Sequence, residues 1–256
     1  MSEEDFRNCN NLTIHTCNTL NLPISNFNET SSNYALKSFK YIVDKWKRNP
    51  INNQNGEKIL IRCNMPKENI TGSHHDYMRL TLKLFLRRNF VDSLKKALKH
   101  IFSELCLDYV DVLIISLPRE FQENIDDFMK VWDIIEEYGE MEKIGRIGVC
   151  DMSENALRSL LRLARIKPMI NQVHISECMT ISAEFDSFLD KENILLMTHQ
   201  DDEGLMINEH IDELKKAVGL HNMEKWNSTW LLRYTALYRK MGVIRSKGFL
   251  GHFQKF

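Results

Sequence analysis

The sequence predicts an α/β fold, a (β/α)8 barrel formed by a single domain that spans residues 1–256. Two observations support it. Apolar patterns with the period of a strand alternate with patterns of helical period from Arg79 to His199. The length of 256 residues also suits such a barrel, for which about 250 residues is typical. Repeated β-α units at this spacing indicate a parallel sheet with covering helices. A doubly wound sheet ranks second, because the 10 glycines form no G-x-G-x-x-G motif.

The central elements follow from the alternation in chain order. "LTLKLFL" places leucines at every second position, which is the period of a strand. Asp92 is expected to N-cap the next helix, and Ser153 a later one. The expected strands cover residues 80–86, 110–117, 144–149, 170–175 and 194–199, and the helix before the last of them covers residues 183–189.

The outer elements complete the count of eight strands. Residues 12–16 and 58–63 are predicted to form strands, and a helix is expected between them at residues 33–46. Near the end of the chain, "WLLRYTALYRKMG" is expected to be helical and residues 242–245 to form the last strand. This order fits a closed barrel.

Composition excludes several classes of partner. Hydrophobic residues make up 43% and charged residues 27% of the chain, which is ordinary for a globular protein. Lys and Arg total 34 against 35 Asp and Glu, so a net charge of −1 attracts neither nucleic acid nor an anionic membrane. No apolar run reaches the roughly 18 residues of a membrane span. The first residues lack the order of a signal peptide, so a cytoplasmic protein is expected.

The cysteines predict neither a metal site nor a disulfide framework. All six are scattered without a C-x-x-C pair, which argues against zinc and favours reduced thiols. We expect no bound metal.

Three phrases in the middle of the chain resemble the aldo-keto reductase superfamily. They are "LDYVDVLIISLP", "VWDIIEEYGEMEKIGRIGVCDMS" and "INQVHI", in that order and each on an expected strand. This resemblance implies a barrel with a shortened C-terminus, since the chain ends at Phe256, where the reductases continue into a segment that clasps the 2′-phosphate of their cofactor.

The C-terminal part is similar to one branch of that superfamily, the regulatory or modifier subunits of glutamate–cysteine ligase. The similar phrases are "KPMINQVHISECM", "ILLMTHQD" and "WLLRYTALYRKMGVIRSKGFL", and the resemblance is strongest over residues 92–250. It implies a non-catalytic protein that forms a heterodimer with a catalytic subunit in glutathione biosynthesis. In that family the regulatory subunit improves glutamate use and relieves feedback inhibition by glutathione.

The residues at the strand ends agree with a lost reductase activity. The resemblance implies that an active reductase needs Asp, Tyr, Lys and His at the mouth of the barrel. Ser116 stands in the position of the histidine and cannot titrate near neutral pH. The lysine position falls near Arg87, whose guanidinium keeps its charge. "CNMPKENI" supplies neither the Asp nor the Tyr, so we expect no catalytic residues.

The cofactor site of the reductases is only partly represented. The positions that hold the nicotinamide amide are occupied by Cys150, Asp151 and Gln172, and a histidine, His199, replaces the stacking tyrosine. Gln172 and Lys247 are the remnants of cofactor binding, so we expect no bound cofactor beyond weak NADPH binding. The alternatives are a divergent NADPH-dependent reductase and an inactive barrel that senses NADPH.

The expected interface with the catalytic subunit is the C-terminal apolar segment together with a nearby thiol. These residues are Cys178, Trp226, Trp230, Leu231 and Tyr234. Their apolar and thiol content is the basis of this expectation. Core packing is the competing interpretation.

Overall fold

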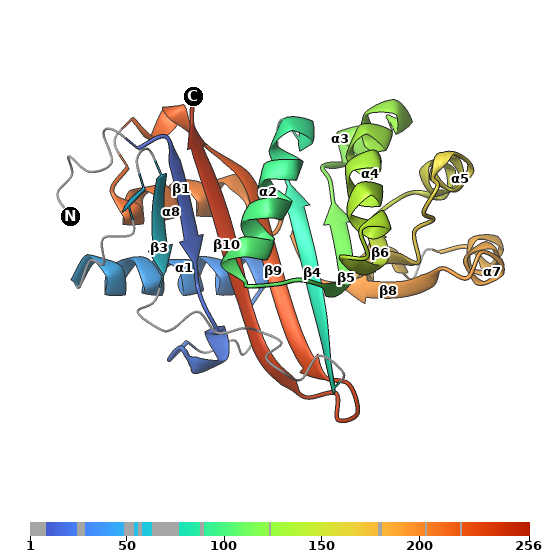
Figure 1. The fold of residues 1–256 in the computed structure, drawn as a ribbon, viewed down its shortest axis with the longest axis horizontal. Coiled ribbons are helices and arrows are strands. Elements are labelled where there is room, and N and C mark those ends of the chain that lie inside the picture. The colour runs from blue at the N-terminus through green and yellow to red at the C-terminus, as the bar shows by residue number, and fades with distance from the viewer. Residues whose placement is uncertain are drawn as a thin grey trace.

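The ten strands found among the described residues lie in one sheet. The computed structural model describes residues 9–24, 29–48, 54–55, 58–62, 77–87, 90–122, 124–178, 181–202, 204–220 and 222–256. The strand order is β2-β3-β1-β10-β9-β4-β5-β6-β7-β8 (Figure 1). The N-terminal strands are β1 (Asn11–His15), β2 (Gln54–Asn55) and β3 (Lys58–Arg62), and α1 (Ser31–Arg48) lies between β1 and β2 in the chain.

Five consecutive strands form the parallel half of the sheet and confirm the predicted β-α alternation. They are β4 (Met78–Leu86), β5 (Val110–Ser116), β6 (Ile144–Cys150), β7 (Ile170–His174) and β8 (Leu195–His199). The connecting helices are α2 (Phe90–Glu104), α3 (Arg119–Gln122), α4 (Ile125–Glu140), α5 (Glu154–Leu163), α6 (Ile175–Cys178) and α7 (Ala183–Lys191). Ser153 caps α5 as predicted, since its side chain accepts a hydrogen bond from the backbone of Ala156. Asp92 lies inside α2 and is not its N-cap.

The end of the chain differs from the prediction. The segment expected as a helix at residues 230–242 lies mostly in strand β9 (Trp226–Tyr238). The last strand, expected to be short at residues 242–245, is the 12-residue strand β10 (Ile244–Lys255). They form an antiparallel hairpin that pairs with β1 on one side and β4 on the other. Because β9 is buried on both faces, it carries apolar residues at consecutive positions, and this hides the period of a strand.

The α/β class is therefore confirmed, and the β4–β8 half follows the barrel pattern. The expectation of eight parallel strands is corrected to a mixed sheet of ten, in which the antiparallel hairpin stands between β1 and β4. Among the described residues, β2 and β8 end the sheet and no ladder joins them.

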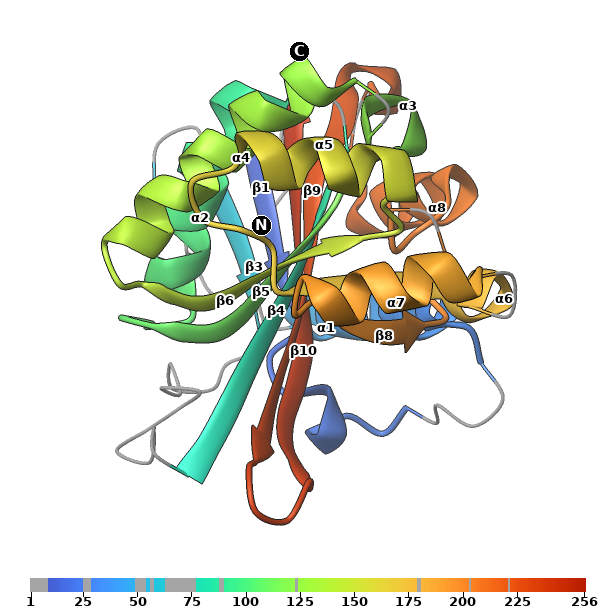
Figure 2. The same cartoon turned by 90° about the vertical axis from the view of Figure 1, so that its right-hand side faces the viewer.

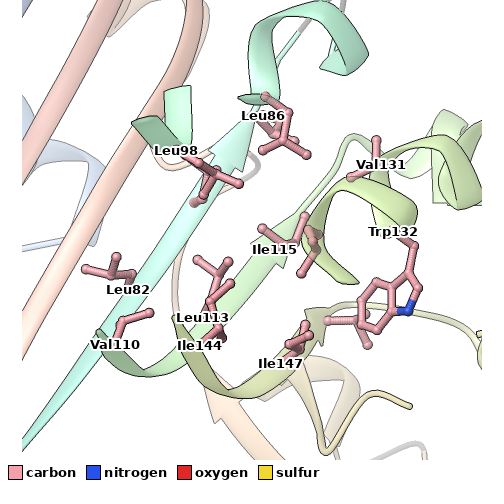
Figure 3. Packing of buried hydrophobic residues seen from close by; sticks show 14 of the residues in the cluster. Leu82, Leu86, Leu98, Val110, Leu113, Ile115, Val131, Trp132, Ile144 and Ile147 are labelled. Carbon is pink, nitrogen blue, oxygen red and sulfur yellow. The ribbon is translucent and has the colours of Figure 1, made fainter. Parts of the chain in front are cut away.

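Helices pack on both faces of the sheet. The described buried apolar residues form one large core on each face and a small separate cluster of Val112, Ile114, Cys150 and Ile170. On one face, the β4 residues Leu80, Leu82, Leu84 and Leu86 belong to a core that also includes residues of α2, α4, α5 and α7, and we call this the α2–α4 face. Figure 3 shows part of this core, with Leu82 and Leu86 of β4 and Leu98 of α2. The opposite face packs on α1 and on α8 (Asn208–Val218), and we call it the α1–α8 face. Figure 1 shows α2 in front of the long central strands, with α1 and α8 behind β1 and β10.

The long hairpin extends past the rest of the sheet at its turn (Figure 2). Two short 3-10 turns, Thr19–Asn21 and Met223–Lys225, complete the described elements. Within the described part of the chain, none of the helices is both long and apolar enough to cross a membrane.

Candidate functional site

A buried ionic cluster lies on the α1–α8 face, where β4 and β9 pair. Lys83 on β4 faces Arg233 on β9, and the loop after β8 brings Asp201 between them. Lys83 Nζ donates to Asp201 Oδ2 at 2.8 Å, and Arg233 donates to both oxygens of the same carboxylate. Burial raises the pKa of Asp201, but the charges of Arg233 and Lys83 outweigh it and hold the pKa below its usual range. Asp201 is therefore ionised and shared by two cations.

A second cluster joins the ends of β6 and β8. Asp151 follows β6 with a φ of 54°, and its carboxylate accepts a hydrogen bond from the backbone N–H of His174 at 2.7 Å. His199 Nε2 lies 2.9 and 3.0 Å from the two Asp151 oxygens. The Cys150 thiol donates to Asp151 Oδ2 at 3.1 Å and lies 3.3 Å from His199 Nε2. A thiol, a carboxylate and an imidazole thus meet within 4.8 Å.

The backbone N–H of Asp201 determines which nitrogen of the neutral His199 ring carries the proton in this second cluster. Its N–H donates to Nδ1 of His199 at 3.1 Å, so the neutral ring carries its proton on Nε2. That proton points at Asp151, and Nε2 can neither take a proton from Cys150 nor bind a metal in this tautomer. Burial raises the pKa of the Cys150 thiol to about 12, although the charge of Lys83 opposes the effect. The cluster is a closed hydrogen-bond unit without an activated nucleophile.

The predicted remnant residues lie on the same face. Ser116 ends β5 opposite Phe85, and Gln172 on β7 is in register with Cys150. Gln172 is buried, its Nε2 reaches the Thr198 carbonyl at 3.5 Å, and its Oε1 has no hydrogen-bond partner among the described residues.

Lys247, the other predicted remnant, lies on the neighbouring hairpin. Its Nζ is 4.9 Å from the centre of the Tyr34 ring on α1. Burial, and then the charge of Arg233, lowers the pKa of Lys247.

The tyrosine that a reductase requires is not supplied by Tyr77. Tyr77 immediately precedes β4 and is exposed, whereas Ser116 and His199 end their strands at the opposite edge. The eight residue-to-residue steps from Tyr77 to Phe85 correspond to about 26 Å along an extended strand. Arg87, near the expected lysine position, donates to the Met206 carbonyl at 2.7 Å and ties the end of β4 to the start of α8. The motif at residues 63–70 lies outside the described residues.

Four of the five expected interface residues are core residues, which corrects the prediction for those four. Trp226, Trp230, Leu231 and Tyr234 are each 2% exposed or less. They lie on both sides of β9, so the helices of the two faces cover them. Cys178 ends α6, and its side chain lies outside the described residues.

The cysteines differ in one respect from the expectation of reduced thiols. Cys17 is disulfide-bonded. Cys106 and Cys150 are free thiols, the first exposed and the second buried.

Sequence reasoning missed the three charged residues at the centre of the site. Lys83 lies within "LTLKLFL", where only the alternating leucines were used to predict a strand. A lysine inside an otherwise apolar strand is a signal for a buried charge, which requires an acidic partner. Asp201 is that acidic partner, and Arg233 binds the same carboxylate. Both residues are distant from Lys83 in the chain, so the sequence near Lys83 gives no signal for them.

Comparison with known proteins identifies relatives among ligase subunits. The chain is 29% identical over 188 residues to the glutamate–cysteine ligase regulatory subunit of Homo sapiens, and the match covers 72% of this chain and 69% of that protein. It is 24% identical over 222 residues to the putative glutamate–cysteine ligase regulatory subunit of Schizosaccharomyces pombe, covering 75% of this chain and 77% of that protein. No family model matches the chain.

Solved structures that resemble the protein are aldo-keto reductases. One is the enzyme MGS-M4 from a deep-sea metagenome library of the Medee basin, at 27% identity and a TM-score of 0.37. The match covers 45% of this chain and 41% of that one, so the likeness is partial. The sequence similarity extends further along the chain, and the proteins matched there are glutamate–cysteine ligase regulatory subunits.

Proposed function

We propose that this protein is a non-catalytic regulatory subunit that binds the catalytic subunit of glutamate–cysteine ligase as a heterodimer. The observation that carries the proposal is the relationship to regulatory subunits from mammals and fission yeast over about three quarters of the chain. The proposed effects are better use of glutamate and weaker inhibition by glutathione. The proposal places the protein in the cytoplasm.

The chemistry of the α1–α8 face supports a role without catalysis. Carbonyl reduction needs a side chain that delivers a proton near neutral pH. Here Ser116 replaces the histidine, Tyr77 is far away, and the proton of His199 is committed to Asp151. Lys83 is held by an ionised carboxylate.

A regulatory subunit acts through a difference in affinity. If the protein binds the catalytically competent state of its partner more tightly than the other states, it shifts the partner toward that state. A tenfold change in the apparent affinity for glutamate requires about 1.4 kcal/mol of such coupling. By reciprocity, glutamate must tighten the heterodimer by the same factor.

Co-expression with the catalytic subunit tests this proposal. We expect the two chains to co-purify in a one-to-one complex. Ligase activity is then titrated with glutamate and with glutathione, with and without this protein. A lower KM for glutamate and a higher inhibition constant for glutathione are the expected results. Failure to co-purify, or unchanged titrations of a formed complex, would contradict the proposal.

A second candidate is an inactive fold that retains NADPH binding. The observation that favours it is Gln172, whose buried amide oxygen accepts no hydrogen bond from the part of the chain that the structure describes. Such a group costs about 1–3 kcal/mol unless a ligand satisfies it. A fluorescence titration with NADPH, repeated with Gln172→Leu, tests the idea. Binding that weakens in the variant without turnover of aldehydes supports it, and turnover would indicate a divergent reductase instead.

A further inference from the structure

A cleft of about 730 Å³ lies on the α2–α4 face, on the opposite side of the sheet from the two clusters described above. Its floor is made by β3, β1, β10 and β9, and one wall is made by α2. Pairing registers align the floor in rows. Asn11 lies between Lys58 and Gln254, and Thr13 lies between Leu60 and His252.

One side of α2 lines this cleft with cations and hydroxyls. Ser93, Lys96, His100 and Ser103 recur at intervals of three and four residues, and Lys99 joins them. Lys95 is absent from the cleft, because its Nζ pairs with Glu137 on α4 at 2.9 Å. On α2, Lys95 is therefore paired with a carboxylate outside the cleft, whereas Lys96 and Lys99 line the cleft.

The described lining of the cleft carries positive charge. Lys58, Lys96 and Lys99 line it, its described lining residues include no Asp or Glu, and these three lysines make no ion pair with any residue that the structure describes. Each lysine presents a compact ammonium charge that suits phosphate. Three ammonium groups around one cavity match a ligand that carries more than one negative charge.

The floor is rigid where it meets these charges. The His252 ring is stacked on Trp230 with an interplanar angle of 5°, and Thr229 Oγ1 lies 2.6 Å from its Nδ1. Burial lowers the pKa of His252 to about 4, and the nearby charges of His100 and Lys58 contribute to this effect. A fixed floor lowers the ordering cost of binding.

We propose that this cleft binds an organic phosphate of nucleotide size that carries at least two negative charges. Ligand pockets commonly hold about 300–1,000 Å³, so the volume suits a nucleotide and is far larger than inorganic phosphate needs. The inference is independent of the proposed regulatory role. It assigns a site on a face that neither the ionic cluster nor Gln172 touches.

Isothermal titration of the full chain with ATP and with pyrophosphate, in magnesium-free buffer at low salt, tests the assignment. We expect one site per chain, with an affinity that weakens as salt rises. The double variant Lys96→Gln, Lys99→Gln should lose about tenfold in affinity, whereas the matched control Lys95→Gln should stay within about twofold. Both lysines are exposed on α2, so the variants retain the fold, which the melting temperature checks.

Several results would overturn the proposal. They are no binding at millimolar ATP, an equal loss in the Lys95→Gln control, or a loss caused by Gln172→Leu on the other face. A poly-glutamate peptide that binds as tightly as ATP would show that the cleft recognises acidic protein segments instead. Pyrophosphate binding as tightly as ATP would show that the rest of the nucleotide makes no contact, which contradicts the size assignment.

Discussion

Substitution of Asp201 is the most informative perturbation of the buried ionic cluster. The carboxylate is 1% exposed, Lys83 is 2% exposed, and Arg233 is 20% exposed. Asp201→Asn keeps the shape but leaves the Lys83 ammonium buried without an anion. Breaking a buried pair in this way costs about 3–5 kcal/mol. Lys83→Met should cost clearly less, about 1–2 kcal/mol, because Arg233 still holds the carboxylate and the methionine fills the space of the lysine stem.

Urea unfolding at pH 7 measures this asymmetry, with Lys95→Met as a control for an exposed pair worth about 1 kcal/mol or less. The pH dependence adds an independent check. The folded-state pKa of Asp201 is depressed, so its contribution is fully present above the unfolded pKa of about 3.9 and is lost as pH falls toward the folded value. Asp201→Asn should therefore lose less stability than the wild type on acidification below about pH 4. If Lys83→Met proved as destabilising as Asp201→Asn, the reasoning from the shared carboxylate would be refuted.

Three further predictions concern other parts of the molecule. The pKa of His252 is lowered to about 4, mainly by burial. The free energy of unfolding should therefore fall by about 3 kcal/mol as pH drops from about 6.5 to 4, because the unfolded chain binds a proton that the folded protein excludes. In thermal melts, His252→Gln should show a weaker dependence on pH over this range. Iodoacetamide followed by mass spectrometry should label exposed Cys106 and spare buried Cys150, and rapid labelling of Cys150 in the folded protein would contradict its raised pKa. Gly248→Ala should cost about 2–3 kcal/mol in chemical unfolding, since a Cβ there meets the Cys17 carbonyl and the Tyr234 ring, whereas Gly242→Ala meets no neighbour and should cost about 1 kcal/mol for its φ of 64°.

The sequence allowed prediction where local periodicity and burial agree. The strands of the parallel half face helices on at least one side, so alternating leucines and the caps of the following helices mark their positions. Ser153 is an example, because its hydroxyl caps α5 and the apolar period begins three residues later. These signals need only neighbours in the chain.

The C-terminal hairpin could not be predicted in the same way. Its strands pair with β1 and β4, whose partner residues lie more than 140 positions away in the chain. Side chains such as Leu231 and Leu232 enter different cores, so no face of the segment is polar. A strand buried on both faces and a buried helix then look alike.

Asp201 connects the two clusters of the candidate site through its carboxylate and its backbone N–H. Its carboxylate fixes the charges of Lys83 and Arg233, while its backbone N–H fixes the tautomer of His199. The proton of that ring goes to Asp151, which also accepts the thiol of Cys150. The charged groups and the ring proton of these two clusters are thus held by neighbours within the same face. This arrangement agrees with the proposed regulatory role, in which the protein acts by binding its partner.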